Sequence, residues 1–174
     1  RIAAEMAAEK TDVSADKIYG LFCNESGYQT PKTDTRAAVF KDGKILLVHE
    51  KNGTWSLPGG WCDVDQSVAS NTVKEVREET GVDAAIIKYI GKSQYSFTVP
   101  EDTVEKEVHW YLMMADSYYS KPQREEYFVD SGFYKYHEAY HLLKFANEKQ
   151  ILEKAFEEYL ELKRNNLWGS RKYF

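Results

Sequence analysis

One helical pattern stands between strand patterns, and this interleaving constrains the fold more than any other feature of the sequence. Residues 68–80, VASNTVKEVREET, carry apolar side chains at spacings of three and four, as an amphipathic helix requires. Ser67 is placed to cap this helix and Gly81 to end it. Strand patterns at 35–50 and 84–116 flank the helix. This order predicts an α+β domain in which a helix covers a mixed sheet. We expect a buried stripe along the helix, made of Val68, Thr72, Val73 and Val76.

The strand patterns indicate how the sheet is built. Segments 35–40 and 44–50 flank an Asp-Gly pair, which is a strong hairpin signal. Residues 103–116 alternate between an apolar face and a polar face. A further strand is expected over 126–136, with a bulge at Gly132.

Helical patterns lie at both ends of the chain. Two of them, near 137–145 and 147–164, close the sequence, and others lie within 2–24. We therefore expect a helical N-terminal appendage over residues 1–28, followed by the main domain over 29–174. Because the sequence opens on Arg1 within a helical pattern, we expect further residues to precede it, and this start does not resemble a signal peptide.

Composition excludes several classes of protein. The 174 residues carry a formal net charge of -5, and no run of Lys and Arg is long enough to follow a nucleic-acid backbone. No apolar run approaches the roughly 20 residues that span a bilayer. The two cysteines have no metal-ligand or redox spacing. This sparing use of Cys predicts a cytoplasmic protein. The charge pattern and the lack of a long apolar run predict that it binds neither nucleic acid nor membrane.

The helical pattern ends in an unusual group of carboxylates. Glu75, Glu78 and Glu79 share one side of the helix, and like charges at these spacings repel. They also lie near the helix C-terminus, where the helix dipole disfavours anions. A divalent cation such as Mg²⁺, which takes oxygen ligands, would compensate for both effects. The alternative is a solvated acidic face whose charges are partnered by Lys74 and Arg77.

The segment from Gly60 to Val82 resembles the signature of the Nudix hydrolases. Seven signature residues agree at the family's spacing: Gly60, Glu75, Val76, Glu78, Glu79, Gly81 and Val82. The preceding WSLPGG is also typical of the family. Gln66 and Lys74 depart from the pattern, which has Glu and Arg there. In the family that pair is thought to brace the helix against the preceding loop, so we expect weaker bracing but intact metal ligands.

The resemblance implies a Nudix-type α/β/α sandwich and cleavage of a diphosphate bond by a metal-activated water. The implied metal is Mg²⁺, with Mn²⁺ as an alternative, held by Glu75, Glu78, Glu79 and the Gly60 carbonyl. The same three glutamates are the implied catalytic groups. The general base is either Glu79 or a carboxylate outside the signature, for which Glu126 and Asp130 are candidates.

Four further residues are candidates for binding the substrate: Arg36, Trp61, Glu107 and His109. Arg36 would meet a phosphate, although an ion pair with a nearby acid explains it equally well. Trp61, directly after the glycines, could stack on a base. Glu107 and His109 share the polar face of their strand, where they either line the site or face solvent.

The resemblance leaves the substrate open. Residues 1–82 are similar to a bacterial subfamily with a helical N-terminal extension that acts on nucleoside diphosphates linked to another group, such as CDP-choline, UDP-X or ADP-ribose. The later half is more similar to hydrolases of dinucleoside polyphosphates. A third hypothesis is a Nudix-fold module that binds a nucleotide without cleaving it, although the retained glutamates speak against it. Family analogy also implies a homodimer.

Overall fold

The computed structural model describes residues 32–100, 102–121 and 128–169. The chain divides into two units, of which Thr33–Gln94 together with Glu107–Phe174 carries the sheet and helices of the fold. The other unit includes Tyr95–Lys106, where the Lys106 ammonium lies 6.0 Å from the centre of the Tyr95 ring. The predicted N-terminal helices lie outside the described residues.

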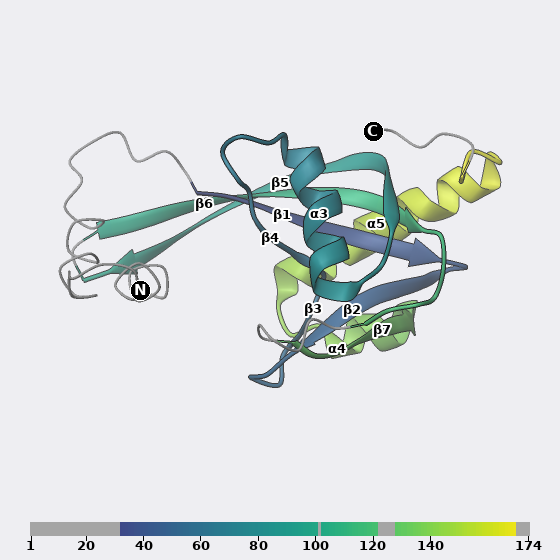
Figure 1. Cartoon of the computed structure of the whole chain (residues 1–174), viewed down its shortest axis with the longest axis horizontal. Helices are drawn as coiled ribbons and strands as arrows, with labels where there is room; N and C mark the ends of the chain where they lie inside the picture. Colours follow the sequence, from purple (N-terminus) through teal and green to yellow (C-terminus); the bar gives the residue numbers. More distant parts are fainter. Residues whose placement is uncertain (1–31, 101, 122–127, 170–174) are drawn as a thin grey trace. The chain divides into compact units, whose positions relative to one another are not determined.

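A seven-stranded sheet forms the centre of the fold. Its strands are β1 (Lys32–Lys41), β2 (Lys44–Glu50), β3 (Trp55–Ser56), β4 (Gly59–Trp61), β5 (Ala84–Val99), β6 (Asp102–Ala115) and β7 (Phe128–Lys135). The main order is β3-β2-β1-β6-β5, with β4 paired to β1 and β7 paired to β2. The β1–β2 hairpin is antiparallel, as predicted. Figure 1 shows β1 and β6 running in the same direction, so the sheet is mixed.

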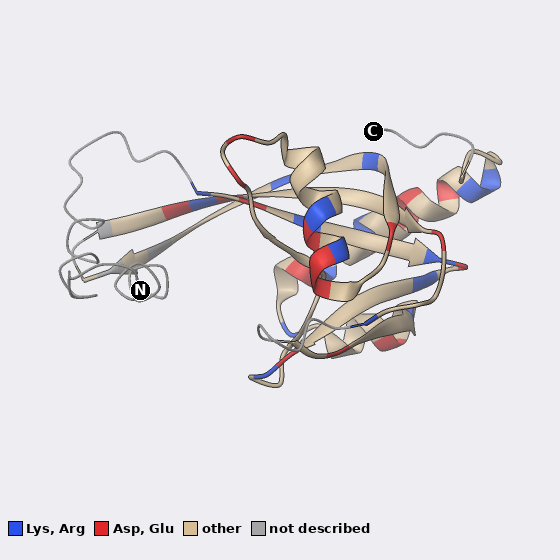
Figure 2. Cartoon of the chain, viewed as in Figure 1, with Lys and Arg blue, Asp and Glu red and all other residues tan. Residues whose placement is uncertain are grey.

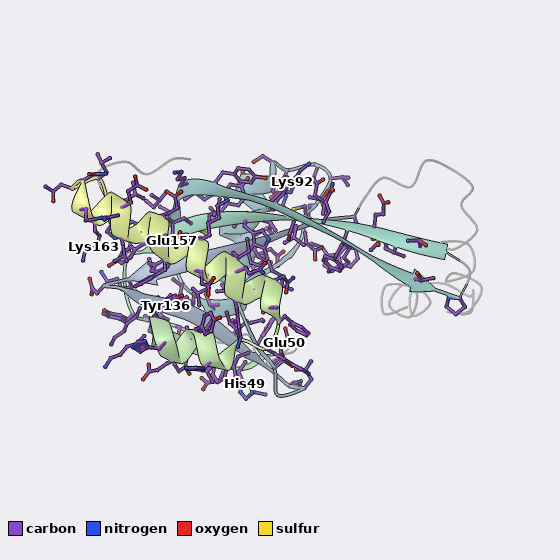
Figure 3. The ribbon with its side chains drawn as sticks, turned by 180° about the vertical axis from the view of Figure 1, so that it is seen from behind. His49, Glu50, Lys92, Tyr136, Glu157 and Lys163 are labelled. Carbon is purple, nitrogen blue, oxygen red and sulfur yellow. The ribbon has the colours of Figure 1, made fainter. Side chains whose placement is uncertain are left out.

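Helices cover both faces of this sheet. Helix α3 (Val68–Thr80) lies on one face, while α4 (Tyr136–Leu142) and α5 (Ala146–Arg164) lie on the other, as Figure 1 and the reverse view in Figure 3 show. Apolar side chains fill the space on each side. The larger core, on the α4–α5 side, includes Phe40, Trp110, Leu112, Leu152 and Tyr159. The smaller core, under α3, includes Ala37, Val39, Leu46, Val76 and Met113. The predicted α/β/α sandwich is confirmed.

Helix α3 begins and ends where the sequence predicts. The Ser67 hydroxyl accepts a hydrogen bond from the Ser70 amide at 3.1 Å, and Gly81 adopts a left-handed φ of 70°. The predicted stripe is wrong at Val73, which is 38% exposed. The buried face instead includes polar groups of α3: Asn71, Thr72, Glu79 and Thr80 lie there beside Val76. This rotation of the helix brings Glu79 into the interior.

The alternation in β6 is also confirmed, because Val108, Trp110 and Leu112 are buried in the larger core. The bulge predicted at Gly132 is wrong. Gly132 pairs regularly with Leu47, and the irregularity of this ladder lies between His49 and Glu50. None of the described helices is long and apolar enough to cross a membrane.

Candidate active site

A bend at Pro58 leads into Gly59 and Gly60, the first two residues of β4, and we call these three residues the glycine turn. They meet carboxylates near the end of α3. The Gly59 amide donates a hydrogen bond to Glu79 Oε2 at 3.1 Å. At Gly60, a Cβ atom would overlap the Glu75 carboxylate. Two residues of the glycine turn therefore lie directly against two glutamates of α3, and at Gly60 the missing side chain is what permits this approach.

Glu79 is a buried acid. Its exposed fraction is 7%, and burial raises the pKa of its carboxyl to about 8, against the opposing effects of the Gly59 amide and the nearby Arg36. The neighbouring Glu75 and Glu50 add to the rise. A carboxylate held in such surroundings gains a great deal from a bound cation.

The other two signature glutamates are more accessible, since Glu75 is half-buried and Glu78 is exposed. Figure 2 shows acidic and basic residues following one another along α3. The two basic residues have aspartate partners in the flanking loops. Lys74 Nζ lies 2.8 Å from Asp63, and Arg77 Nε lies 3.2 Å from Asp83. These ion pairs weaken the interpretation of the glutamates as an acidic face partnered by Lys74 and Arg77.

The loop before α3 is braced without the side chain of Gln66. Asn71 accepts a hydrogen bond from the Asp63 amide at 3.0 Å and donates one to the Ser67 carbonyl at 3.0 Å. The Lys74–Asp63 contact adds to this bracing, and Asp63 is the main cause of the raised pKa of Lys74. The loop therefore has its own substitute for the Glu–Arg pair of the family signature.

The donor atoms at this site suit a hard cation. Glu75, Glu79 and the glycine turn offer oxygen ligands, which Mg²⁺ prefers. Within the described ranges, no group of at least three His, Cys, Asp or Glu side chains is arranged to hold a metal ion. The donor atoms thus fit Mg²⁺ in their chemistry, although three carboxylates are not gathered around one point in this part of the structure.

A second polar group lies beside the first. In it Arg36 forms the ion pair with an acid that the sequence left open as an alternative, while its partner Glu148 was not found by sequence reasoning. Arg36 Nη1 donates to the Leu57 carbonyl at 2.9 Å and lies 3.7 Å from Glu148 Oε1. Glu148 is 5% exposed, and burial raises the pKa of its carboxyl. Glu50 lies near enough to raise the pKa of both Glu148 and Glu79. An acid in the first turn of a helix is ordinary in a sequence, so nothing marked Glu148 as special.

A row of polar side chains runs along the α3 side of β5 and β6. His109 Nε2 lies 2.7 Å from Glu107 Oε1, and His109 Nδ1 lies 2.8 Å from the Tyr89 hydroxyl. Lys92 and Gln94 also donate to Glu107, at 3.3 and 3.1 Å. The structure thus brings together Glu107 and His109, which the sequence placed on one face, and adds Tyr89.

This row approaches the acidic helix through two further side chains. The Tyr89 ring lies 5.2 Å from the Tyr111 ring, centre to centre. Burial, Tyr89 and the nearby Cys62 raise the pKa of Tyr111. Burial, Asp34 and Glu75 in turn raise the pKa of Cys62 to about 11. Tyr111 and Cys62 therefore connect the polar row to the acidic end of α3.

The remaining candidates occupy separate places. Trp61 is 55% exposed in β4, directly after the glycines. Asp130 is exposed in β7 and accepts a hydrogen bond from the Ser131 amide at 2.8 Å. Glu126 lies outside the described residues. The roles of these residues stay predictions.

We expect the burial of Glu79 to make stability depend on pH in metal-free protein. Between its ordinary pKa near 4.5 and its folded value of about 8, the native state keeps a proton that the unfolded state loses, so stability falls as pH rises through this window. The Gln side chain of Glu79→Gln stays neutral at every pH, so the free energy of unfolding of this variant should rise relative to that of the wild type by up to about 4 kcal/mol as pH increases through the window. Melting curves in EDTA from pH 5 to 8.5 measure the difference. A difference that does not change with pH would show that Glu79 is ionised throughout.

The fold and the site define an α/β/α protein in which an acidic helix lies against the glycines of β4 in a mixed sheet. Comparison with known proteins gives this class its name. The sequence model of the NUDIX domain matches residues 31–156, and the chain belongs to the Nudix family.

Individual relatives support the same assignment. The "Putative ADP-ribose pyrophosphatase YjhB" of Bacillus subtilis strain 168 is 48% identical over 84 residues, which cover 48% of this chain and 40% of the relative. The chain thus spans about two fifths of the length of that curated relative. A crystal structure of an ADP-ribose pyrophosphatase from Streptococcus suis 89-1591 is 35% identical with a TM-score of 0.60, covering 75% of this chain and 92% of that one. A UDP-X diphosphatase structure, at 24% identity and a TM-score of 0.56, shares the fold and covers 92% of this chain and 78% of its own.

Proposed function

We propose that the protein is a metal-dependent pyrophosphohydrolase that cleaves the diphosphate linkage of a nucleoside diphosphate joined to another group. The observation that carries this proposal is the buried Glu79, whose carboxylate accepts a hydrogen bond from the Gly59 amide. Beside it, the carboxylate of Glu75 lies against Gly60. A site that concentrates negative charge around a close backbone approach is suited to a cation and, through it, to phosphate oxygens.

Glu75, Glu78, Glu79 and the Gly60 carbonyl would hold Mg²⁺, with Mn²⁺ as a substitute. When bound, the ion supplies charge neutralisation of the diphosphate and a water of lowered pKa. Of these carboxylates, Glu79 is the best suited to act as general base, because burial raises its pKa to about 8 and so gives it a high affinity for a proton near neutral pH. The exposed Glu78 is free to turn towards an incoming ion.

Residues outside α3 would bind the organic parts of the substrate. Trp61 offers an exposed ring for stacking beside the glycine turn. Glu107 and His109 offer a carboxylate and an imidazole already linked by a hydrogen bond. Arg36 has further N–H groups besides the one that contacts Leu57, so it can still donate to a phosphate.

Among nucleoside diphosphate derivatives we place ADP-ribose first, since the YjhB relative and the Streptococcus suis structure carry that substrate in their names. A hydrolysis panel with product identification tests this choice. It should contain ADP-ribose, CDP-choline, UDP-sugars, diadenosine polyphosphates and oxidised dGTP, each with Mg²⁺, with Mn²⁺ and with EDTA. We expect AMP and ribose 5-phosphate from ADP-ribose, only when metal is present. Preferential release of a nucleotide from a diadenosine polyphosphate would instead make this a dinucleoside polyphosphate hydrolase, and binding without any product would make it a binding module.

The same panel tests the substrate side of the site. Glu107→Gln should raise KM on the preferred substrate by about tenfold, because the carboxylate that orients His109 is lost, while kcat changes little. Glu105→Gln removes an exposed carboxylate from the same strand and serves as the control. An unchanged KM in Glu107→Gln would assign the row to the solvated surface.

A homodimer and a cytoplasmic location stay predictions from the sequence. Light scattering of the purified chain tests the first, and fractionation of cells that express it tests the second.

A further inference from the structure

Glu148, in the first turn of α5, is a buried acid that the proposed chemistry does not use. Its side chain is 7% exposed, and its Oε2 atom has no hydrogen-bond partner among the described residues. Burying a carboxyl with one oxygen unsatisfied costs free energy, so the contacts of the other oxygen must have a compensating value. Figure 3 shows the start of α5 close to Glu50, which borders the acidic site.

The partners of Glu148 meet at Leu57. Arg36 lies 3.7 Å from Glu148 Oε1 and uses the same Nη1 atom to donate to the Leu57 carbonyl at 2.9 Å. The Leu57 amide stabilises the ionised Glu148 and opposes the rise in its pKa. Both backbone polar groups of Leu57 are therefore held from outside, by residues 21 and 91 positions away along the chain.

Leu57 opens the segment that reaches the acidic helix. The Pro58 carbonyl accepts a hydrogen bond from the Ala37 amide at 2.9 Å, and the Gly59 amide donates to Glu79. Gly60 then lies against Glu75. Because consecutive backbone groups move together, the position of Leu57 sets where the next three residues stand relative to α3.

We propose that Arg36 and Glu148 form a positioning clamp that fixes Leu57–Gly60 in the place that Glu79 and Glu75 require. The clamp deepens the proposed function and rests on it for its catalytic meaning. It connects β1 and the first turn of α5 to the glycine turn, so three elements distant in sequence set the geometry of one site. Displacement of such a site by about 1 Å is enough to cost a large part of the rate.

A double-mutant cycle with two readouts tests the clamp. Arg36→Met, Glu148→Gln and the double variant should each raise the hydrogen-exchange rate of the Gly59 amide by about tenfold and weaken Mn²⁺ binding to a similar degree. The double variant should be no worse than the worse single variant, because either change alone opens the clamp. NMR measures the exchange and electron paramagnetic resonance measures free Mn²⁺. Glu158→Gln, which breaks the 2.7 Å contact of the same helix with Lys88, is the control and should change neither quantity.

Three results would overturn the proposal. Weaker Mn²⁺ binding in Glu148→Gln alone, with Gly59 exchange unchanged, would make Glu148 a metal ligand. Additive effects in the double variant would make the two residues independent. Faster exchange spread equally over the core amides would show that Arg36 and Glu148 have only a general structural role. If Arg36→Met does not fold, Arg36→Lys, which keeps the charge but loses the planar fork, provides the same comparison. Gly59 exchange needs no substrate, so the clamp can be judged even where the hydrolysis panel finds no product.

Discussion

Glu78→Gln should lower kcat by about 100-fold or more while the fold stays intact, the size of effect seen when one group that stabilises a transition state electrostatically is removed. Glu78 is exposed, so the substitution costs no buried contact, yet it removes one negative charge from the proposed cation site. Steady-state rates with ADP-ribose, measured across Mg²⁺ concentrations, give both kcat and the metal requirement. Circular dichroism and the melting temperature confirm the fold.

The control for this variant is Glu157→Gln. Glu157 is an exposed acid on α5, on the opposite face of the sheet, as Figure 3 shows. It loses the same charge, so any general effect of net charge appears in both variants. Equal rates in Glu78→Gln and Glu157→Gln would remove Glu78 from the catalytic group.

Alanine at the two neighbouring glycines should have opposite consequences. At Gly59, a Cβ would overlap the Thr35 carbonyl oxygen and the Arg36 Cα, which are backbone atoms fixed in β1. We expect Gly59→Ala to destabilise the protein by about 3 kcal/mol or more, because a packed backbone has no room to yield. Urea unfolding followed by fluorescence measures this loss.

At Gly60, the overlap is with the carboxylate end of Glu75, a side chain that can move aside. Gly60→Ala should therefore fold with nearly wild-type stability and lose about 10- to 100-fold in kcat, since Glu75 is displaced from the site. The pair separates the structural use of one glycine from the catalytic use of the next. Loss of stability in Gly60→Ala, or normal stability in Gly59→Ala, would contradict this division.

Local patterns predicted the elements well because their causes are local. The cap at Ser67, the left-handed end at Gly81 and the bounds of α3 follow from side chains within a few residues of one another. The alternation in β6 needed only the two-residue period of a strand. The predictions of a buried Val73 and of a bulge at Gly132 were wrong for the opposite reason. The rotation of a helix and the position of a bulge depend on what packs against them.

Sequence by itself determined the order of the described helices and strands, the group of glutamates at the end of α3 and the family, since all of these follow from the spacing of residues along the chain. Tertiary structure alone decided which glutamate is buried, that Lys74 and Arg77 pair with flanking aspartates, and that Glu148 reaches the glycine turn. The physical reason is that burial and pairing depend on distances between segments far apart in the chain. A carboxylate in a helix reads the same in sequence whether it faces water or Arg36; only packing sets its pKa, its partner and its use.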